Sequence, residues 1–193
     1  MIDQHEGLIR AHGEFSARVS LVTSDHWDTQ SACDEWTIGD LVDHVIGGNA
    51  FTVAILKGVS AEDAMQTAIK TVELNADRRP EAIEHTAAAM IELVSAAATP
   101  GLVYHHVEGD MERGRVVTLR INDITLHAWD LARSLGADEM LDEDLVELVW
   151  TAMSPLAEDL ATSGRFGTGA SGLIAEDAPL QARLIDLTGR GYS

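Results

Sequence analysis

Apolar side chains recur every three or four residues along most of this chain, which is the period of an α-helix with one buried face. In residues 2–24 the stripe consists of Leu8, His12, Phe15, Val19 and Val22. Further helices are expected over 37–57, 60–76, 80–98, 115–135, 142–162 and 178–188. Residues 102–107 favour an extended segment, and a turn is expected at 108–114. The pattern therefore predicts an all-α protein, a four-helix bundle with one short extended segment.

Capping residues and helix breakers indicate where several of these helices begin and end. Thr37 followed by Asp40 resembles a capping box, and Trp36 is placed to act as a hydrophobic staple. Gly136 is a C-cap for the helix before it, and Pro155 should kink the helix that contains it. We predict two parts, a bundle domain at 1–163 and a C-terminal extension at 164–193 that packs on the bundle.

Charge and composition exclude several classes of partner. The 193 residues include 13 Lys+Arg and 32 Asp+Glu, for a formal net charge of −19, which repels nucleic-acid phosphates and anionic membranes. No stretch approaches the roughly 18 consecutive apolar residues of a membrane span, and no secretory signal opens the chain. The single cysteine, Cys33, allows no internal disulfide. We expect a cytoplasmic protein with no nucleic-acid or membrane partner.

The helix predicted at 115–135 is apolar almost all round, so we expect it to be central and buried. One polar line follows it at intervals of three, four and three residues, consisting of Arg120, Asp123, His127 and Asp130. Ionisable groups on a buried helix are costly unless they pair or bind an ion. Asp123 and His127 have the spacing of two metal ligands, and equally that of an ordinary Asp–His hydrogen bond.

The helix with the capping box carries a second polar group on an apolar face. His44 lies there, and a lone His in such a place is most often a core residue. The neighbouring Gly47-Gly48 pair costs about 1 kcal/mol per glycine relative to Ala, which suggests that another helix or a ligand approaches closely. Together with Asp123 and His127, His44 would complete a three-ligand site with an open position, typical of a catalytic divalent metal.

Four more residues are candidates for supporting such a site or touching a substrate, and each has a structural alternative. His12 could face the metal cavity or pack in the core, and His105 could contact substrate or be solvated. Arg120 could pair with Asp123 or with an anionic substrate. Asp130 could orient a metal ligand or bind a neighbouring arginine.

Two stretches of the chain also resemble a known family. Residues 33–49, CDEWTIGDLVDHVIGGN, are similar to the C-x-x-W-T-v-x-D-L-v-x-H-l-x-G-G-N stretch of actinobacterial mycothiol-dependent maleylpyruvate isomerase-like proteins, in the DinB/YfiT-like metalloprotein superfamily. Residues 123–133 resemble the [DE]-x-x-x-H-x-W-D-L-A-R segment of that family, with a weaker match in the tail. The resemblance implies a DinB/YfiT-like four-helix bundle whose metal is held by His44, Asp123 and His127.

In the founding branch of that family the metal is zinc, and the acid position is Glu where this chain has the shorter Asp123. The metal lowers the pKa of the thiol of mycothiol, so that thiolate is present at neutral pH. Thiolate adds to a cis double bond, rotation follows, and elimination gives the trans isomer. The nucleophile then belongs to the cosubstrate, and Cys33 is expected to be a buried loop cysteine.

We therefore expect a mycothiol-dependent isomerase or S-transferase-like metalloenzyme that acts on a small electrophile, with Zn, Ni or Fe as the ion. Two alternatives stay open: a hydrolase that uses metal-bound hydroxide, and a non-catalytic metal- or ligand-binding stress protein. The same ligand types also suit Fe(II) oxygenases, which generally have other folds. The expected partners are a small-molecule substrate and a low-molecular-weight thiol, and a homodimer is left open.

Overall fold

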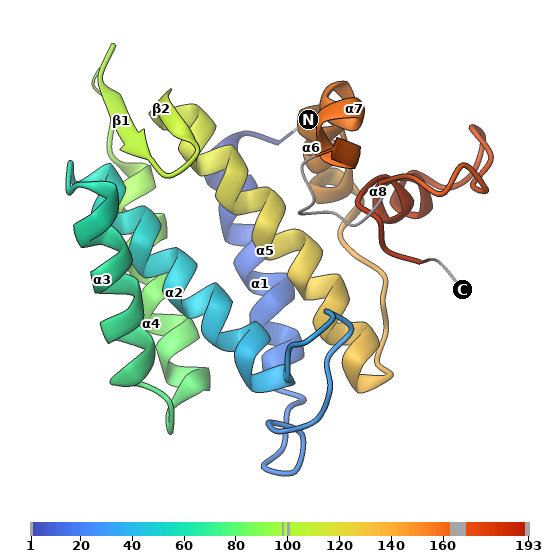
Figure 1. The fold of residues 1–193 in the computed structure, drawn as a ribbon, viewed down its shortest axis with the longest axis horizontal. Helices are drawn as coiled ribbons and strands as arrows, with labels where there is room; N and C mark the ends of the chain where they lie inside the picture. Colours follow the sequence, from blue (N-terminus) through green and yellow to red (C-terminus); the bar gives the residue numbers. More distant parts are fainter. Residues whose placement is uncertain (1, 98, 100, 163–168, 192–193) are drawn as a thin grey trace. The chain divides into compact units, whose positions relative to one another are not determined.

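A computed structural model describes residues 2–97, 99, 101–162 and 169–191 (Figure 1). The helices are α1 (Gln4–Val19), α2 (Ile38–Leu56), α3 (Ala61–Glu73), α4 (Arg79–Ser95), α5 (Arg113–Leu135), α6 (Glu143–Met153), the 3₁₀ helix η1 (Ser154–Leu156), α7 (Ala157–Thr162) and α8 (Leu180–Leu187). Strands β1 (Val103–His106) and β2 (Gly109–Glu112) pair antiparallel. The all-α prediction is confirmed, and the expected turn at 108–114 contains the second strand of a hairpin.

The chain divides into two compact units, Asp3–Glu139 and Met140–Ser193 together with Met1–Ile2. The boundary expected between 163 and 164 lies among residues 163–168, outside the described part of the chain, and packing of a C-terminal extension on the bundle stays a prediction. The helix expected over 142–162 is interrupted at Pro155, where η1 separates α6 from α7. Proline has no N–H to donate to the helical ladder, which explains the interruption.

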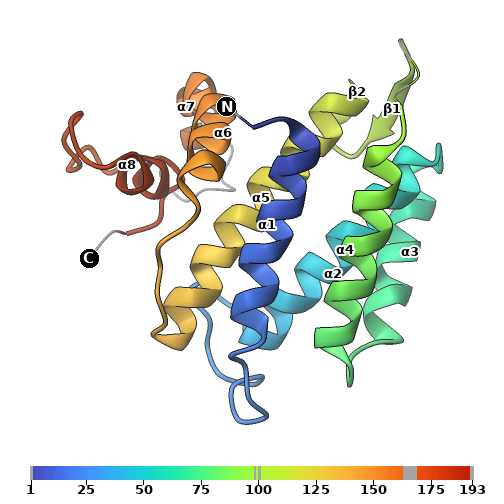
Figure 2. The same ribbon diagram turned by 180° about the vertical axis from the view of Figure 1, so that it is seen from behind.

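Four helices of the first unit form a closed ring. Helix α1 packs against α4 and α5, and α2 packs against the same two helices. Figure 2 shows α1 and α4 on one side of this unit, and Figure 1 shows α2 and α5 on the other. Helix α3 packs on α2, and the β1–β2 hairpin contacts α2 and α5 near one end of the ring. This ring places α2 and α5 side by side along their middle turns.

Local signals in the sequence set several helix ends. The Thr37 side chain accepts from the Asp40 N–H at 3.1 Å, and the Asp40 carboxylate accepts from the Thr37 N–H at 2.9 Å, which confirms the capping box. Gly136 ends α5 with a left-handed φ of 61°, as expected of a C-cap glycine. Helix α1 stops at Val19, earlier than the predicted residue 24. The N–H of Thr23 donates to His26 Nδ1 instead of to a helical carbonyl.

Helix α5 is buried over most of its length, as its composition predicts. Apolar side chains on several sides of it are fully covered, among them Ile121, Ile124, Leu126, Ala128 and Leu131. Within the described residues, no helix is long and apolar enough to span a bilayer.

Candidate metal centre

Three polar side chains meet where α2 and α5 lie side by side. His44 Nε2 lies 3.1 Å from Asp123 Oδ1, and His127 Nε2 lies 3.6 Å from the same oxygen. One donor atom from each residue lies within 4.8 Å of the other two. The interval of four residues places Asp123 and His127 on one face of α5. His44 joins them only because α2 packs on that face.

The group is open to solvent on one side and covered on another. The side chains of His44 and Asp123 are 37% and 31% exposed, whereas that of His127 is 11% exposed. The ring of Trp36 packs over both imidazoles, with centroid distances of 4.9 Å to His44 and 5.7 Å to His127. Trp36, expected as a hydrophobic staple, therefore forms an aromatic wall beside the three donor atoms.

Asp123 is held as a carboxylate by the charges around it. Arg120 donates from Nη1 to Asp123 Oδ2 at 2.7 Å. Of the two partners expected for Arg120, Asp123 or an anionic substrate, the structure shows the ion pair with Asp123. Burial acts to raise the pKa of Asp123, but the charges of Arg120, His127 and His44 outweigh it and hold that pKa well below its ordinary value. Asp123 is therefore an anionic oxygen donor at neutral pH.

His127 is oriented by a second carboxylate. Its Nδ1 lies 2.9 Å from Asp130 Oδ2, and Asp130 is almost completely buried. A carboxylate only accepts, so Nδ1 carries the hydrogen and Nε2 is directed toward Asp123. Burial acts to lower the pKa of His127, but Asp123, Asp130 and Cys33 raise it well above its ordinary value in the metal-free protein. Such a carboxylate–imidazole pair is the usual support of a histidine that binds a metal.

Cys33 lies closer to these residues than its sequence position alone indicated. Its Sγ is 3.4 Å from Asp130 Oδ2 and 3.9 Å from His127 Nδ1. Donor atoms of Cys33, His127 and Asp130 form a second group within 4.8 Å of one another. In the sequence, only one feature indicated that Cys33 lies near the centre: it begins the stretch 33–49 that resembles the family and that also contains Trp36 and His44.

The loop before α2 is held by several hydrogen bonds, three of them from one side-chain amide. Gln30 Nε2 donates to the carbonyls of Ser31, Cys33 and Trp36 at 2.9–3.2 Å. The N–H of Ala32 donates to Ser134 Oγ at 2.8 Å, which ties the loop to α5. Cys33 and Trp36 are therefore positioned by polar contacts of the loop rather than by a regular element.

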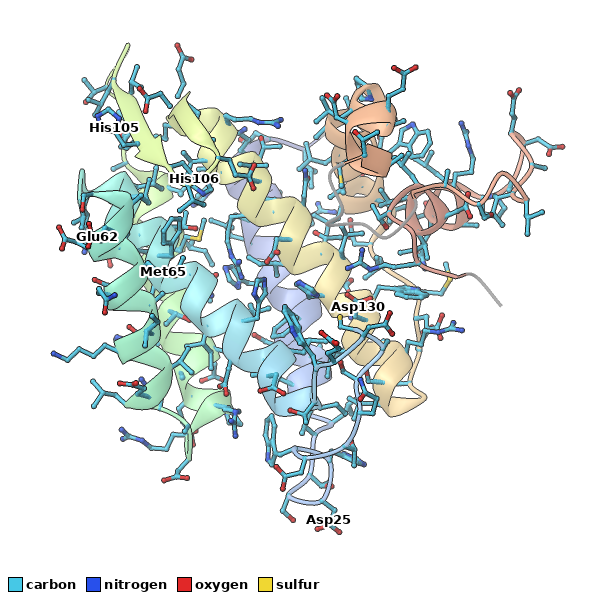
Figure 3. The ribbon with its side chains drawn as sticks, viewed as in Figure 1. Asp25, Glu62, Met65, His105, His106 and Asp130 are labelled. Atoms are coloured by element: carbon cyan, nitrogen blue, oxygen red, sulfur yellow. The ribbon has the colours of Figure 1, made fainter. Side chains whose placement is uncertain are left out.

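Among the described residues, neither His12 nor His105 hydrogen-bonds to His44, Asp123 or His127. His12 is 3% exposed, neither ring nitrogen has a hydrogen-bond partner among the described residues, and burial together with the Arg120 charge lowers its pKa to about 3. His105 is exposed on the hairpin, with Nδ1 2.7 Å from Asp110 Oδ1. Figure 3 shows His105 at the outer edge of the hairpin, far from Asp130. Side chains alternate along a strand, so β1 turns Tyr104 inward and His105 outward.

Each glycine of the Gly47-Gly48 pair in α2 lets a side chain of another helix approach the backbone closely. The free-energy cost of two glycines inside a helix had suggested such an approach. A Cβ on Gly47 would lie 3.3 Å from Val72 Cγ2. A Cβ on Gly48 would press against Arg120 Nη1 and lie 2.7 Å from Arg120 Cζ, so the guanidinium would have to shift. Gly48 is therefore needed for the Arg120 guanidinium to reach Asp123.

The donor set fits a divalent metal ion. Two imidazole nitrogens and one carboxylate oxygen suit Zn²⁺ and neighbouring first-row ions, and three protein ligands with an open side are typical of catalytic rather than structural sites. The buried Asp130 beside His127 supplies the outer support that such ligands need.

Residues 8–132 match the family model described as the mycothiol maleylpyruvate isomerase N-terminal domain. The chain belongs to this family. The family assignment made from the stretches at 33–49 and 123–133 is thereby confirmed.

Relatives and solved structures agree with this family. Two uncharacterized proteins of Mycobacterium tuberculosis, MT0763 of strain CDC 1551 / Oshkosh and Rv0738 of strain H37Rv, are each 30% identical over 174 residues, covering 88% of this chain and 85% of their own. A crystal structure of a histidine-to-alanine mutant of the mycothiol-dependent maleylpyruvate isomerase matches with TM-score 0.63 and 19% identity, over 88% of this chain and 74% of that one. A further crystal structure of the mycothiol-dependent maleylpyruvate isomerase matches with TM-score 0.62 and 19% identity, over 85% of this chain and 72% of that one. These matches confirm the predicted DinB-like fold.

Proposed function

We propose that this protein is a metal-dependent enzyme that uses mycothiol to isomerise, or to conjugate, a small electrophilic substrate. One observation carries the proposal: donor atoms of His44, Asp123 and His127 lie within 4.8 Å of one another on a side of the bundle that solvent reaches. Mycothiol is proposed as the thiol because the matching family is that of the mycothiol maleylpyruvate isomerase N-terminal domain.

The residues of this chain would divide the work as follows. His44, His127 and Asp123 would hold the divalent ion, which when bound supplies the positive charge that stabilises a thiolate at neutral pH. Asp130 holds the hydrogen on His127 Nδ1 and so keeps Nε2 free to bind. Trp36 covers one flank of the imidazoles and limits the access of water there.

No protein nucleophile is required in this scheme. The cosubstrate sulfur adds to one carbon of a conjugated cis double bond, and a proton is taken up at the neighbouring carbon. The resulting single bond rotates, and loss of the proton and of the thiolate restores the double bond in trans. Where the thiolate is not lost, the same addition leaves a thioether and the reaction is a transfer.

Metal content tests the centre. Protein purified without a nickel column should contain a stoichiometric divalent metal, and His44→Ala should lose it. His85→Ala is the matched control, because His85 is exposed on α4. Equal metal content in wild type and His44→Ala would defeat the assignment.

Thiol dependence tests the reaction. The metal-loaded protein is incubated with maleylpyruvate and a panel of electrophiles, with and without mycothiol. Turnover only with the thiol supports the proposal. Thiol-independent hydrolysis of esters or amides would replace it with a metal-dependent hydrolase, and retained metal without either reaction would indicate a binding protein.

A further inference from the structure

Arg120 is buried directly behind the candidate metal centre, although the proposed reaction gives it no part. Arg120 is 6% exposed, and its guanidinium donates to three acceptors inside the bundle. Nε donates to Asn49 Oδ1 at 3.0 Å, Nη2 to the Val45 carbonyl at 3.0 Å, and Nη1 to Asp123 Oδ2 at 2.7 Å. Two of these partners belong to α2 and one to α5, so the guanidinium links both helices of the centre.

These contacts divide the two oxygens of Asp123 between different neighbours. Oδ2 accepts from Arg120, whereas Oδ1 faces His44 at 3.1 Å and His127 at 3.6 Å. With Arg120 in place, the carboxylate offers one oxygen to the side where the imidazoles converge. A guanidinium held by three acceptors in different directions has little freedom to turn away.

The Arg120 guanidinium occupies the space that a side chain at residue 48 would fill, and Gly48 has none. A side chain at this position would meet Arg120 Cζ at 2.7 Å and Nη2 at 3.2 Å. The nearest Arg120 atom is Nη1, the donor to Asp123 Oδ2, so a side chain at residue 48 would push away the group that binds the carboxylate. The adjacent Gly47 faces α3 instead, where a Cβ would meet only Val72 and Ala68.

We propose that Arg120 is a positioning residue for the metal centre: it binds Asp123 Oδ2 so that Oδ1 alone is presented to the cation, and Gly48 is the residue that admits it. This inference rests on the proposed function, because it requires that the three donor atoms bind a cation. Outer contacts of this kind typically change metal affinity by about 10- to 100-fold when they are removed.

An opposing effect makes the test decisive. The guanidinium is a positive charge near the place of a dication, so its removal could tighten binding by relieving repulsion. If positioning dominates, Arg120→Met and Gly48→Ala weaken binding. If repulsion dominates, Arg120→Met tightens it.

The experiment uses Co²⁺ as the probe in the full-length protein. Affinity is measured by competition with a chromophoric chelator, and the visible absorption of bound Co²⁺ reports the ligand arrangement. We expect Arg120→Met and Gly48→Ala to lose about 10- to 100-fold in affinity and to change the spectrum, with Arg120→Lys in between. Gly47→Ala, the matched control, should keep the wild-type affinity and spectrum.

The outcomes separate the inference from the function on which it rests. Failure of the wild-type protein to bind Co²⁺ or Zn²⁺ would overturn both. Wild-type binding with unchanged or tighter binding in Arg120→Met and Gly48→Ala would overturn only the role of Arg120. Circular dichroism and thermal unfolding identify folded variants, and Gly48→Ala keeps the test valid if Arg120→Met does not fold, since alanine favours a helix. A purely structural role for Arg120 would lower stability while leaving Co²⁺ affinity and spectrum unchanged, which also contradicts the proposal.

Discussion

Asp130 Oδ2 lies 2.9 Å from His127 Nδ1, and both side chains are buried in the first unit. The pair orients one imidazole of the candidate centre from the side opposite to Asp123. Because Asp130 comes three residues after His127 in α5, this orientation is built into a single helix and does not depend on how α2 packs.

Asp130→Asn should weaken metal binding by about 10-fold or more, because the neutral amide holds the imidazole less strongly and lowers the basicity of Nε2. Chelator competition with Zn²⁺ measures the change. Asp110→Asn is a matched control, since Asp110 pairs with the exposed His105 on the hairpin. Identical affinities in Asp130→Asn and wild type would show that Asp130 does not support the centre.

Trp36 offers a direct optical report on where the metal binds. Its ring lies 4.9 Å from that of His44, so bound Co²⁺ should quench its fluorescence at short range. Trp36→Phe should therefore remove most of the metal-dependent quenching. Full quenching in Trp36→Phe would place the cation away from His44.

The metal-free protein should respond to pH through His127. Its folded-state pKa is raised above the unfolded value of about 6.5, because the attraction of Asp123 and Asp130 outweighs burial. The stabilisation by ionised His127 is therefore complete below about pH 6.5 and is lost as the pH rises through the folded-state pKa. Urea unfolding of metal-free wild type and His127→Gln, from about pH 6 to about pH 9, should show a difference in stability that narrows with rising pH. A difference that stays constant or widens contradicts the assignment.

Cys33→Ser separates a supporting thiol from a nucleophile. The contact of Cys33 with Asp130 is a weak hydrogen bond, so its loss should change kcat/KM by no more than about 10-fold. Steady-state kinetics with mycothiol and the active electrophile measure this. Abolished turnover with normal metal content would assign the nucleophile to Cys33 rather than to the cosubstrate.

The sequence alone determined the features that depend on neighbours within one or two helical turns. The capping box of Thr37 and Asp40, the Gly136 C-cap and the shared face of Asp123 and His127 follow from intervals of three or four residues. The burial of α5 was evident because its apolar side chains point in nearly every direction. The cost of Gly47-Gly48 correctly indicated close approach, but not which neighbour approaches.

Only the tertiary structure decided the contacts that join distant segments. His44 and Asp123 are 79 positions apart, Arg120 and Asn49 are 71 apart, and Cys33 reaches Asp130 across 97. Such contacts depend on how the side chains of α2, α5 and the loop before α2 pack against one another. The spacing of residues along the chain does not predict this packing. Hydrogen bonds along a helix are fixed by spacing, whereas the centre is fixed by packing, which every helix of the ring determines together.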